Sequence, residues 1–538
     1  MNQNRLNFFR TILTVVAIIL AVYLGFKLGK NQATLQSRSI EVRTPISKLD
    51  NILRLIATKY IDSVSISDII ESSIPMIVEH LDPHSTYIPA QDFAEINEPL
   101  QGNFEGIGIT FNMTSDTIIV INTISGGPSS RVGIEAGDRI LRINDSLVAG
   151  RKIDSDSIVK KLKGPSGSKV SLDIQRQGFD KEIPFTITRA KIPIKSIDVA
   201  YMVNEDIGFI KISKFSRTTY EEFIAAINKL KKQGMKKIIL DLRDNTGGYL
   251  DQVIGIINEF FSEKVLIVYT EGYNSKRDNA YSRGKGRCAD IPIMVLINES
   301  SASASEILAG AIQDNDRGEI VGRRSFGKGL VQEPITFSDG SGLNLTVSRY
   351  YTPTGRCIQK PYDKGLKKYY HELYDRLLNN EFFERDSIHF NDSLKYTTPK
   401  GKIVYGGGGI MPDIFVPLDT IGNSNQFFRL IAQKNLAYNF VLNYTDMNRE
   451  KINGITDFKE LDDFLKTQQI FDKFLTYATR NGVSVKSNEL TEAKQILEPQ
   501  LLALIGRNTP LDDEGFYPYY QRIDLTLQVA IDTMANIK

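Results

Sequence analysis

The sequence predicts an α/β protein built from several domains. Its 538 residues are 41% hydrophobic and 24% charged. At roughly 100–200 residues per domain, such a chain can bury several cores. Strands alternate with helices from about residue 194 to 416, which predicts a layered α/β sheet with largely parallel pairing. Short strands and glycine turns fill residues 102–189, and helical patterns lie toward both ends of the chain.

These changes of pattern divide the chain into five segments. We predict a signal anchor or signal peptide (1–29), a linker with an N-terminal helical region (30–101), a β-rich domain (102–190), an α/β domain (191–420) and a C-terminal helical region (421–538).

The first segment predicts export. Arg5 and Arg10 precede an apolar run over residues 11–29, which at ~1.5 Å per residue is barely long enough for a ~30 Å hydrocarbon core. The arginines favour a cytoplasmic start, and no A-x-A cleavage pattern follows. We therefore prefer an uncleaved anchor in the inner (cytoplasmic) membrane to a removed signal peptide. The rest of the chain is expected on the periplasmic side.

The N-terminal helical region is predicted from Ile46 to about Ala94, with apolar residues at helical spacing and a break at the proline turn over residues 81–86. In the β-rich domain we predict strands over residues 104–111, 117–121, 139–143, 170–176 and 182–188, and a helix over 153–162. In the α/β domain we predict strands over 207–212, 237–242, 265–270 and 291–297, and helices over 219–232, 250–261 and 305–313. The C-terminal region is predicted to be helical and to serve packing, with no chemistry of its own.

Composition argues against several functions. A net charge of +2 without long charged blocks gives no field for nucleic acid. The four histidines form no H-E-x-x-H or Cys/His pattern, so we expect no metal and no cofactor. For Cys288 and Cys357 we prefer two unpaired thiols to one bridge. The sequence leaves self-association open.

One candidate catalytic segment is Asn298-Glu299-Ser300-Ser301-Ala302-Ser303-Ala304-Ser305-Glu306, between a predicted strand and a predicted helix. A nucleophile there would lie at the carboxyl end of the strand, beside the positive N-terminus of the helix. Ser303-x-x-Glu306 also fits a capping box, so taken alone the segment favours simple helix capping.

The second candidate is Ser325-Phe326-Gly327-Lys328-Gly329-Leu330-Val331-Gln332. Burial can lower the pKa of a lysine until the amine acts as a base. Alone, the segment favours a solvated turn lysine. The preceding residues nearly match the phosphate-binding G-x-x-x-x-G-K-[ST] motif, but Gly329 lacks the hydroxyl that binds Mg²⁺, which argues against a nucleotide site.

A third segment, Asp241-Leu242-Arg243-Asp244-Asn245-Thr246-Gly247-Gly248, ends a buried strand in a double-glycine turn. Such a turn either simply connects the strand to the next helix or aims backbone N–H groups at an oxyanion.

Together these three ordered motifs resemble the carboxyl-terminal processing peptidases, also called tail-specific proteases. The resemblance covers roughly residues 50–420 and includes the 25-residue spacing between the serine and the lysine. It implies a crotonase-like ββα fold, Ser303 as nucleophile, Lys328 as base and Gln332 as the residue that orients the lysine. It also implies an oxyanion hole formed by Ala304 with either Gly247 or Gly248. A Ser-His-Asp triad that uses His84 or His371 stays open.

Residues 102–190 resemble a PDZ domain, with Gly106-Ile107-Gly108-Ile109 similar to its carboxylate-binding loop. Such loops bind a peptide C-terminus through backbone N–H groups. Exported trypsin-like proteases also carry PDZ domains, but there the domain follows a G-N-S-G-G segment, and the nearest match here lacks the serine.

The sequence therefore predicts a serine endopeptidase that cleaves exported proteins near or from their C-termini, with free C-termini captured by the PDZ domain. The alternative is a catalytically silent PDZ scaffold that only holds peptides.

Overall fold

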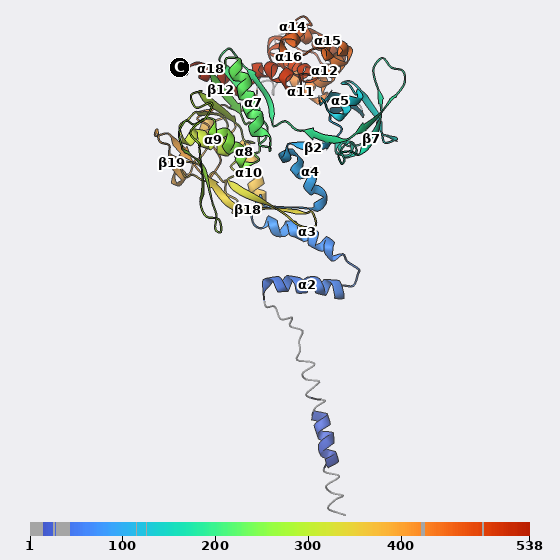
Figure 1. The fold of residues 1–538 in the computed structure, drawn as a ribbon, viewed down its shortest axis with the longest axis vertical. Helices are drawn as coiled ribbons and strands as arrows, with labels where there is room; N and C mark the ends of the chain where they lie inside the picture. Colours follow the sequence, from blue (N-terminus) through green and yellow to red (C-terminus); the bar gives the residue numbers. More distant parts are fainter. Residues whose placement is uncertain are drawn as a thin grey trace, which may run out of the picture. The chain divides into compact units, whose positions relative to one another are not determined.

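The computed structural model describes residues 14–24, 27, 44–114, 116–124, 126–420, 426–486 and 489–537. The chain divides into two compact units, one ending at Ile77 and the other starting at Val78 (Figure 1). The prediction of mixed helix and sheet, with helical regions toward both ends, is confirmed.

In the first unit, the secondary structure of the described residues is helical. Residues 14–24 are helical, whereas residues 1–13, 25–26 and 28–29 of the predicted anchor lie outside the described residues. Among the residues that are described, no helix is both long and apolar enough to span a bilayer. Helix α2 (Pro45–Lys59) begins at Thr44, whose hydroxyl accepts the N–H of Ser47 at 3.2 Å, and helix α3 (Ile66–Glu79) follows.

The second unit starts with a short strand, β1 (Thr86–Ile88), and helix α4 (Ala90–Gln101). The β-rich domain then forms an antiparallel sheet in the order β3-β4-β5-β7-β8. Its elements are β2 (Asn103–Gly106), β3 (Ile109–Thr114), β4 (Thr117–Thr123), α5 (Pro128–Val132), β5 (Arg139–Ile143), β6 (Ser146–Leu147), α6 (Ser155–Leu162), β7 (Lys169–Gln175), β8 (Ile183–Thr188) and β9 (Ala190–Pro193). The predicted strand over 104–111 is two strands, because the chain breaks at Ile107 and Gly108.

The α/β domain is built on a six-stranded sheet in the order β10-β11-β12-β15-β16-β21. Every pair is parallel except β10 with β11, as the alternation of strands and helices predicts. The elements are β10 (Ile197–Met202), β11 (Ile207–Ile212), α7 (Thr219–Lys232), β12 (Lys237–Asp241), α8 (Leu250–Asn258), β15 (Ile293–Ile297), α9 (Ala304–Asp314), β16 (Glu319–Gly322) and β21 (Ile414–Phe415). Helices α7, α8 and α9 pack on one face and form its hydrophobic core.

A second sheet carries β1 at its edge, in the order β1-β18-β13-β14, with β17 also paired to β18. Its strands are β13 (Leu266–Glu271), β14 (Asp278–Tyr281), β17 (Leu330–Thr336) and β18 (Gly342–Tyr351). Helix α10 (Leu366–Leu378) and the hairpin β19 (Lys395–Thr397) with β20 (Ile403–Tyr405) follow. The sheet therefore joins residues near position 86 to residues near position 343.

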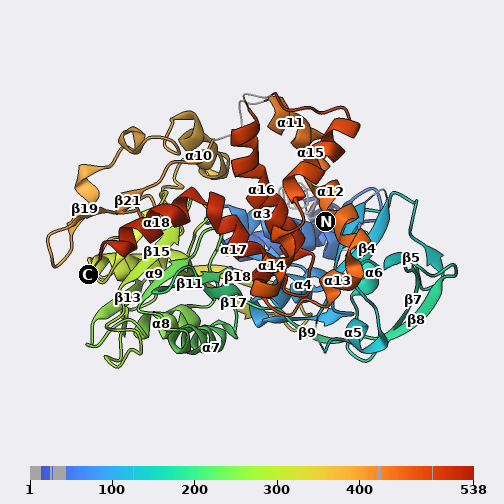
Figure 2. The ribbon, with the colours of Figure 1, turned by 90° about the horizontal axis from the view of Figure 1, so that it is seen from above.

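The C-terminal region is helical, as predicted. It comprises α11 (Gln426–Gln433), α12 (Leu436–Met447), α13 (Arg449–Asn453), α14 (Phe458–Lys466), α15 (Ile470–Arg480), α16 (Leu490–Arg507), α17 (Asp513–Tyr520) and α18 (Leu525–Ala535). Helices α11–α16 have their own core, but α18 lies against the six-stranded sheet (Figure 2).

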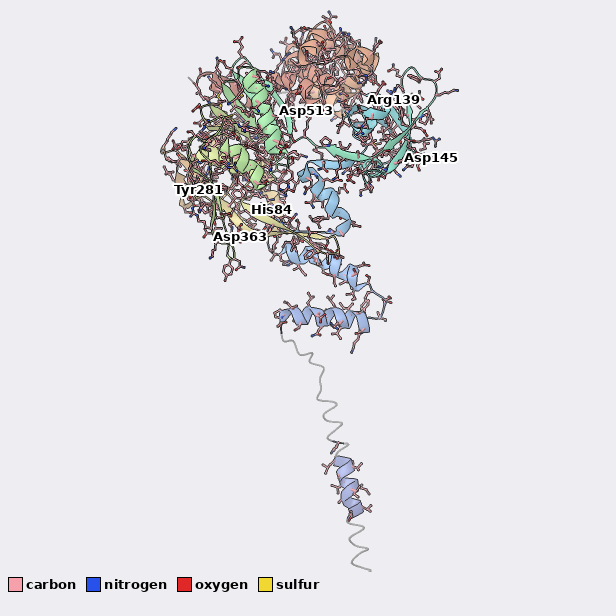
Figure 3. All side chains as sticks on the ribbon, in the orientation of Figure 1. His84, Arg139, Asp145, Tyr281, Asp363 and Asp513 are labelled. Atoms are coloured by element: carbon pink, nitrogen blue, oxygen red, sulfur yellow. The ribbon has the colours of Figure 1, made fainter. Side chains whose placement is uncertain are left out.

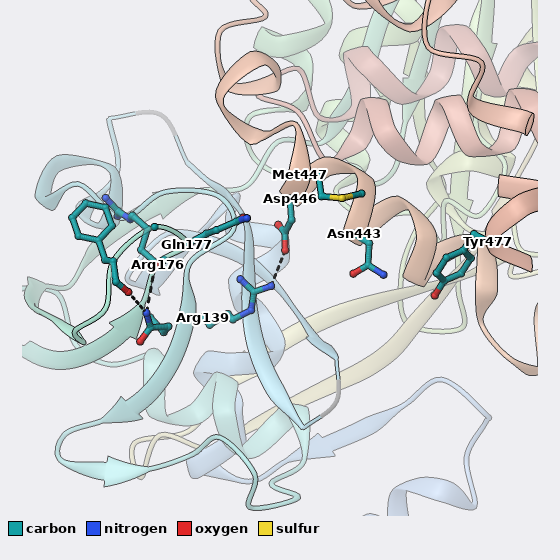
Figure 4. Close-up of a pocket in the computed structure, with 10 residues that line it drawn as sticks. Arg139, Arg176, Gln177, Asn443, Asp446, Met447 and Tyr477 are labelled. Carbon is teal, nitrogen blue, oxygen red and sulfur yellow. Dashed lines mark hydrogen bonds and ion pairs between the residues drawn. The ribbon is translucent and has the colours of Figure 1, made fainter. Parts of the chain in front are cut away.

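The C-terminal helices also contact the β-rich domain, around a cleft of about 610 Å³ shown in Figure 4. Arg139 of β5 forms an ion pair of 2.7 Å with Asp446 of α12 at this cleft. The Asn122 amide donates to the backbone oxygen of Thr509 at 3.3 Å. The C-terminal region thus contacts both the β-rich domain and the α/β domain.

Candidate active site

Ser303 lies in a strained turn between β15 and α9. All five residues of β15 are buried, so the strand fixes where the turn begins. Ser303 has φ 56° and ψ −115°, a conformation that a non-glycine residue adopts only when its surroundings enforce it. Helix α9 begins at the next residue, so its positive N-terminus faces any negative charge that develops at Ser303.

Two neighbouring serines have structural hydrogen bonds. The hydroxyl of Ser301 donates to the Leu242 carbonyl at 2.8 Å, and that of Ser305 donates to the Asn245 carbonyl at 2.8 Å. Both serines are fully buried, whereas Ser303 is partly exposed. Among these three hydroxyls, Ser303 is the one that a substrate can reach.

Glu306 joins the serine turn to the lysine loop. One carboxylate oxygen accepts the backbone N–H groups of Ser303 at 2.9 Å and Lys328 at 2.8 Å. The other accepts the Ser325 hydroxyl at 2.5 Å and the Gly327 N–H at 2.7 Å. Because one oxygen binds both N–H groups, the Ser303 and Lys328 backbones lie within two hydrogen-bond lengths of each other. Glu306 therefore does more than cap α9.

Lys328 lies in a largely buried environment. Burial lowers the pKa of its amine below the ordinary value, while the negative charges of Glu306 and Asp82 oppose this shift. The hydroxyl of the fully buried Tyr350 lies within hydrogen-bond distance of two backbone carbonyls, that of Lys328 and, at 3.2 Å, that of Ser303, and its one proton can bind either. The loop is thus held in place around an amine whose pKa is lowered by burial.

Gln332 begins a hydrogen-bond network that extends to the N-terminal part of the second unit. Its amide donates to the Thr346 hydroxyl at 3.2 Å, and Thr346 donates to the Asp82 carboxylate at 3.1 Å. Asp82 also accepts the Ser85 hydroxyl at 2.6 Å and the N–H groups of His84 and Ser85. The turn before β1 therefore holds the strand pair that carries Gln332.

The double-glycine turn lies directly against Ser303. A Cβ added at Gly247 would come within 2.7 Å of the Ser303 Cβ, and one added at Gly248 would come within 2.1 Å of the Phe215 carbonyl oxygen. The Gly247 N–H donates to the Asn245 side chain at 2.9 Å. In the described part of the chain, the N–H groups of Gly248 and Ala304 have no acceptor.

Neither candidate histidine is placed as the base. His84, labelled in Figure 3, hydrogen-bonds through Nε2 to the Tyr369 hydroxyl at 2.6 Å. Burial and the nearby Lys328 charge lower its pKa to about 4. His371 is exposed on α10 and pairs with Asp375. Within the described residues neither histidine hydrogen-bonds to Ser303.

The proposed carboxylate-binding loop lines an apolar groove. A cavity of about 230 Å³ lies between residues 106–109 and the α6 side chains Val159 and Leu162. In the described part of the chain, the N–H groups of Ile107 and Gly108 have no acceptor. The last turn of α4 adds Glu98 and Pro99 to the wall of the groove, and Glu98 pairs with Lys163 at 2.5 Å.

Comparisons with known proteins agree with this geometry. Residues 206–368 match peptidase family S41, residues 106–187 match the PDZ domain, and residues 427–509 match a family of unknown function, DUF8443. The carboxy-terminal-processing protease of Bartonella bacilliformis is 36% identical over 322 residues, which are 58% of this chain and 72% of the relative. This chain belongs to the carboxy-terminal processing serine proteases of family S41.

Other proteins are similar to the protease over most of its length or over the PDZ domain alone. The carboxy-terminal processing protease CtpB of Bacillus subtilis is 34% identical, over 62% of this chain and 69% of that one. Among solved structures, the photosystem II D1 C-terminal processing protease is 22% identical over 71% of this chain and 95% of that chain, with a TM-score of 0.35. The PDZ domain of a carboxy-terminal protease from Vibrio cholerae, solved in complex with a peptide, is 35% identical over 17% of this chain and 99% of that chain, with a TM-score of 0.16.

The predictions of a serine peptidase and of a PDZ domain in front of it are therefore confirmed, and the silent scaffold is disfavoured. The two cysteines are free, as preferred. In the part of the chain that the structure describes, no group of three acidic, histidine or cysteine side chains could hold a metal ion. The roles of the individual site residues stay predictions.

Three residues at this site lie outside the predicted set: Asp82, Thr346 and Tyr350. From the sequence, the turn at Asp82 is predicted only to end a helix. The sequence does contain a local signal for Asp82. An aspartate often accepts the backbone N–H groups of the residues two and three positions later, which are His84 and Ser85 here.

We predict that Asp82→Asn changes the pH dependence of the protease. The Asp82 charge raises the pKa of Lys328, so removing it favours the neutral amine at lower pH. The acid limb of the kcat/KM profile should move to lower pH. The plateau value of kcat/KM should fall by up to about tenfold, because the hydrogen bonds that link Asp82 to Thr346 and Gln332 are weakened, and each contributes roughly 1 kcal/mol.

Asp339→Asn is the matched control, because Asp339 also accepts a serine hydroxyl and N–H, from Ser341, but at the exposed tip of the β17–β18 hairpin. An acid limb that stays in place in Asp82→Asn would contradict an electrostatic effect on Lys328.

Proposed function

We propose that Ser303 is the nucleophile of this protease, that Lys328 is its general base and that Gln332 orients the lysine. The observation that carries the proposal is the Glu306 carboxylate, which binds the backbones of Ser303 and Lys328 through one oxygen. Two further features support it: the strained turn exposes Ser303, and burial favours the neutral Lys328 amine.

The reaction then proceeds in two stages. Neutral Lys328 takes the proton of the Ser303 hydroxyl as the oxygen attacks the peptide carbonyl. The protonated lysine next gives this proton to the leaving amine, and the C-terminal product departs. Water then attacks the acyl-enzyme as Lys328 takes one of its protons, and Lys328 returns this proton to the Ser303 oxygen when the ester bond breaks, which releases the N-terminal product as an acid and restores neutral Lys328.

Gly248 is the better candidate for the second oxyanion donor. The Gly247 N–H already binds Asn245, while those of Gly248 and Ala304 have no acceptor among the described residues. Gly248 lies opposite Phe215 in a parallel β-bridge. The two hydrogen bonds of this bridge are made by the Gly247 carbonyl and the Tyr249 N–H, so the bridge does not use the Gly248 N–H. We infer an oxyanion hole of Gly248 and Ala304.

Covalent labelling tests the nucleophile. A fluorophosphonate probe should modify Ser303, identified by peptide mass spectrometry, and should not modify Ser303→Ala. Labelling should weaken at acid pH, where Lys328 is protonated. A label on Ser301 or Ser305 would show that the nucleophile is wrongly assigned.

We also propose that the PDZ groove captures free substrate C-termini. The N–H groups of Ile107 and Gly108, which have no acceptor among the described residues, suit a carboxylate, and the apolar wall suits an apolar last side chain. Amidating the C-terminus of an unfolded substrate protein should lower kcat/KM about tenfold, since charge-assisted hydrogen bonds contribute about 1.5–3 kcal/mol. Acetylating its N-terminus is the control and should have no effect. Equal cleavage of the amidated and free forms would exclude carboxylate capture.

For localisation we propose an exported protease held in the inner membrane by residues 1–29, with the catalytic domain on the periplasmic side. Support comes from the two arginines and the apolar run of the sequence. The protease should stay in the membrane fraction after a high-salt wash. A soluble mature form that starts near residue 30 would overturn the anchor.

A further inference from the structure

The last helix of the C-terminal region is part of the protease core. Leu527, Ala530 and Met534 of α18 are buried against β12, β15 and β16. The amine of Lys237, the first residue of β12, donates to the carbonyls of Met534 and Ile537. Figure 2 shows α18 along this sheet. Helix α18 is therefore held against the strand that leads into the double-glycine turn.

Asp524, the residue that caps α18, binds that turn directly. The Arg243 guanidinium lies between two carboxylates and donates two hydrogen bonds to each. It reaches Asp241 at 2.9 and 2.6 Å and Asp524 at 2.8 and 2.6 Å. The side chain of Asp241 is 1% exposed and that of Asp524 is 9% exposed. Two forked contacts of this kind hold a planar guanidinium in one orientation.

Arg243 begins the segment that ends at Gly248. Several hydrogen bonds hold the chain between them: Asp244 exchanges hydrogen bonds with Asn298, and the Asn245 amide donates to the Ile212 carbonyl at 2.9 Å. Gly247 donates to the Asn245 side chain. The position of Arg243 is therefore coupled through this turn to the position of the Gly248 N–H.

We propose that Asp524 is a positioning residue for the oxyanion hole: its carboxylate fixes Arg243 and so places the Gly248 N–H beside Ser303. This inference rests on the proposed function. It assigns to the C-terminal region an indirect part in transition-state stabilisation, through a contact that joins residues 281 positions apart.

The structure allows this role to be separated from helix capping. One Asp524 oxygen accepts the Leu527 N–H at 3.1 Å, and this is the cap of α18. Asparagine and serine cap helices about as well as aspartate but carry no charge for Arg243. Asp524→Asn and Asp524→Ser should therefore keep α18 while they remove the ion pair.

The experiment measures kcat, KM and the affinity for a peptide aldehyde, which forms a tetrahedral adduct with a nucleophilic serine. In both variants we expect kcat to fall roughly ten- to hundredfold, as for a misplaced catalytic group, with KM within about twofold. Aldehyde affinity should fall in proportion to kcat, because the adduct shares the oxyanion of the transition state. Rates are taken per folded molecule, with the melting temperature recorded.

Glu514→Gln is the control, because Glu514 of α17 also joins the C-terminal region to the α/β domain, through an exposed ion pair with Lys229 of α7 that lies away from the turn. It should leave all three quantities unchanged. An unchanged kcat in the Asp524 variants, or a lower kcat with unchanged aldehyde affinity, would overturn the inference. Ser303→Ala is assayed in parallel: if it stays active, the proposed catalytic assignment fails whatever Asp524 does.

Discussion

Lys328→Met is expected to abolish peptide cleavage by this protease and to leave its fold intact. Methionine has nearly the length of lysine but cannot take a proton from Ser303. General-base catalysis contributes about 10²–10⁴-fold, so kcat should fall by about 10³-fold or more. Burial already disfavours the charged amine at this position, so an apolar side chain removes a desolvation cost. The melting temperature should stay the same or rise.

Lys360→Met is the contrasting control. Lys360 is 2% exposed and pairs with Glu372 at 3.0 Å, so its loss leaves a partly buried carboxylate with one partner fewer. This variant should melt at a lower temperature yet keep most of its turnover per folded molecule. Substantial peptide cleavage by Lys328→Met would eliminate the Ser–Lys mechanism.

The second large effect is expected from Glu306→Gln. The fully buried carboxylate accepts four donors, whereas a glutamine accepts only at its carbonyl oxygen and turns an NH₂ group toward the remaining donors. Each unsatisfied buried donor costs about 1–3 kcal/mol. Because two of these donors belong to Ser303 and Lys328, we expect kcat to fall about 10²–10³-fold along with a lower melting temperature.

Glu222→Gln separates geometry from stability. Glu222 also accepts four donors, from Ser196, Ile197 and Thr218, but it lies on α7 away from Ser303. It should lower the melting temperature in the same way while kcat per folded molecule is retained. If Glu306→Gln behaved like Glu222→Gln, the carboxylate would only stabilise the fold.

The parts of the site that could be predicted from the sequence are local. The serine turn, the lysine loop and the double-glycine turn each combine small or glycine residues with a strand end, and they can be recognised within about ten residues of chain. The order and spacing of these three motifs along the chain supported the resemblance to the carboxyl-terminal processing peptidases. The oxyanion glycine could not be chosen in advance, because the choice depends on which N–H the Asn245 side chain occupies.

The remaining residues act through contacts between distant positions. Thr346 reaches Asp82 across 264 positions, and Arg243 reaches Asp524 across 281. A single sequence contains no periodicity or spacing signal for such pairs, because each partner looks like an ordinary turn or cap residue in its own segment. Glu306 shows the same limit: its capping pattern was visible, whereas its bonds to the lysine loop depend on tertiary packing.

The packing of α18 on the six-stranded sheet makes the folding of the α/β domain depend on a segment far along the chain. Leu527, Ala530 and Met534 cover the face of the sheet that α7, α8 and α9 leave open. Ser303 and Lys328 lie well before α18 in the sequence. A chain cut between Lys328 and α18 would therefore keep both residues but expose apolar side chains of β12, β15 and β16 to water, and such a fragment should aggregate.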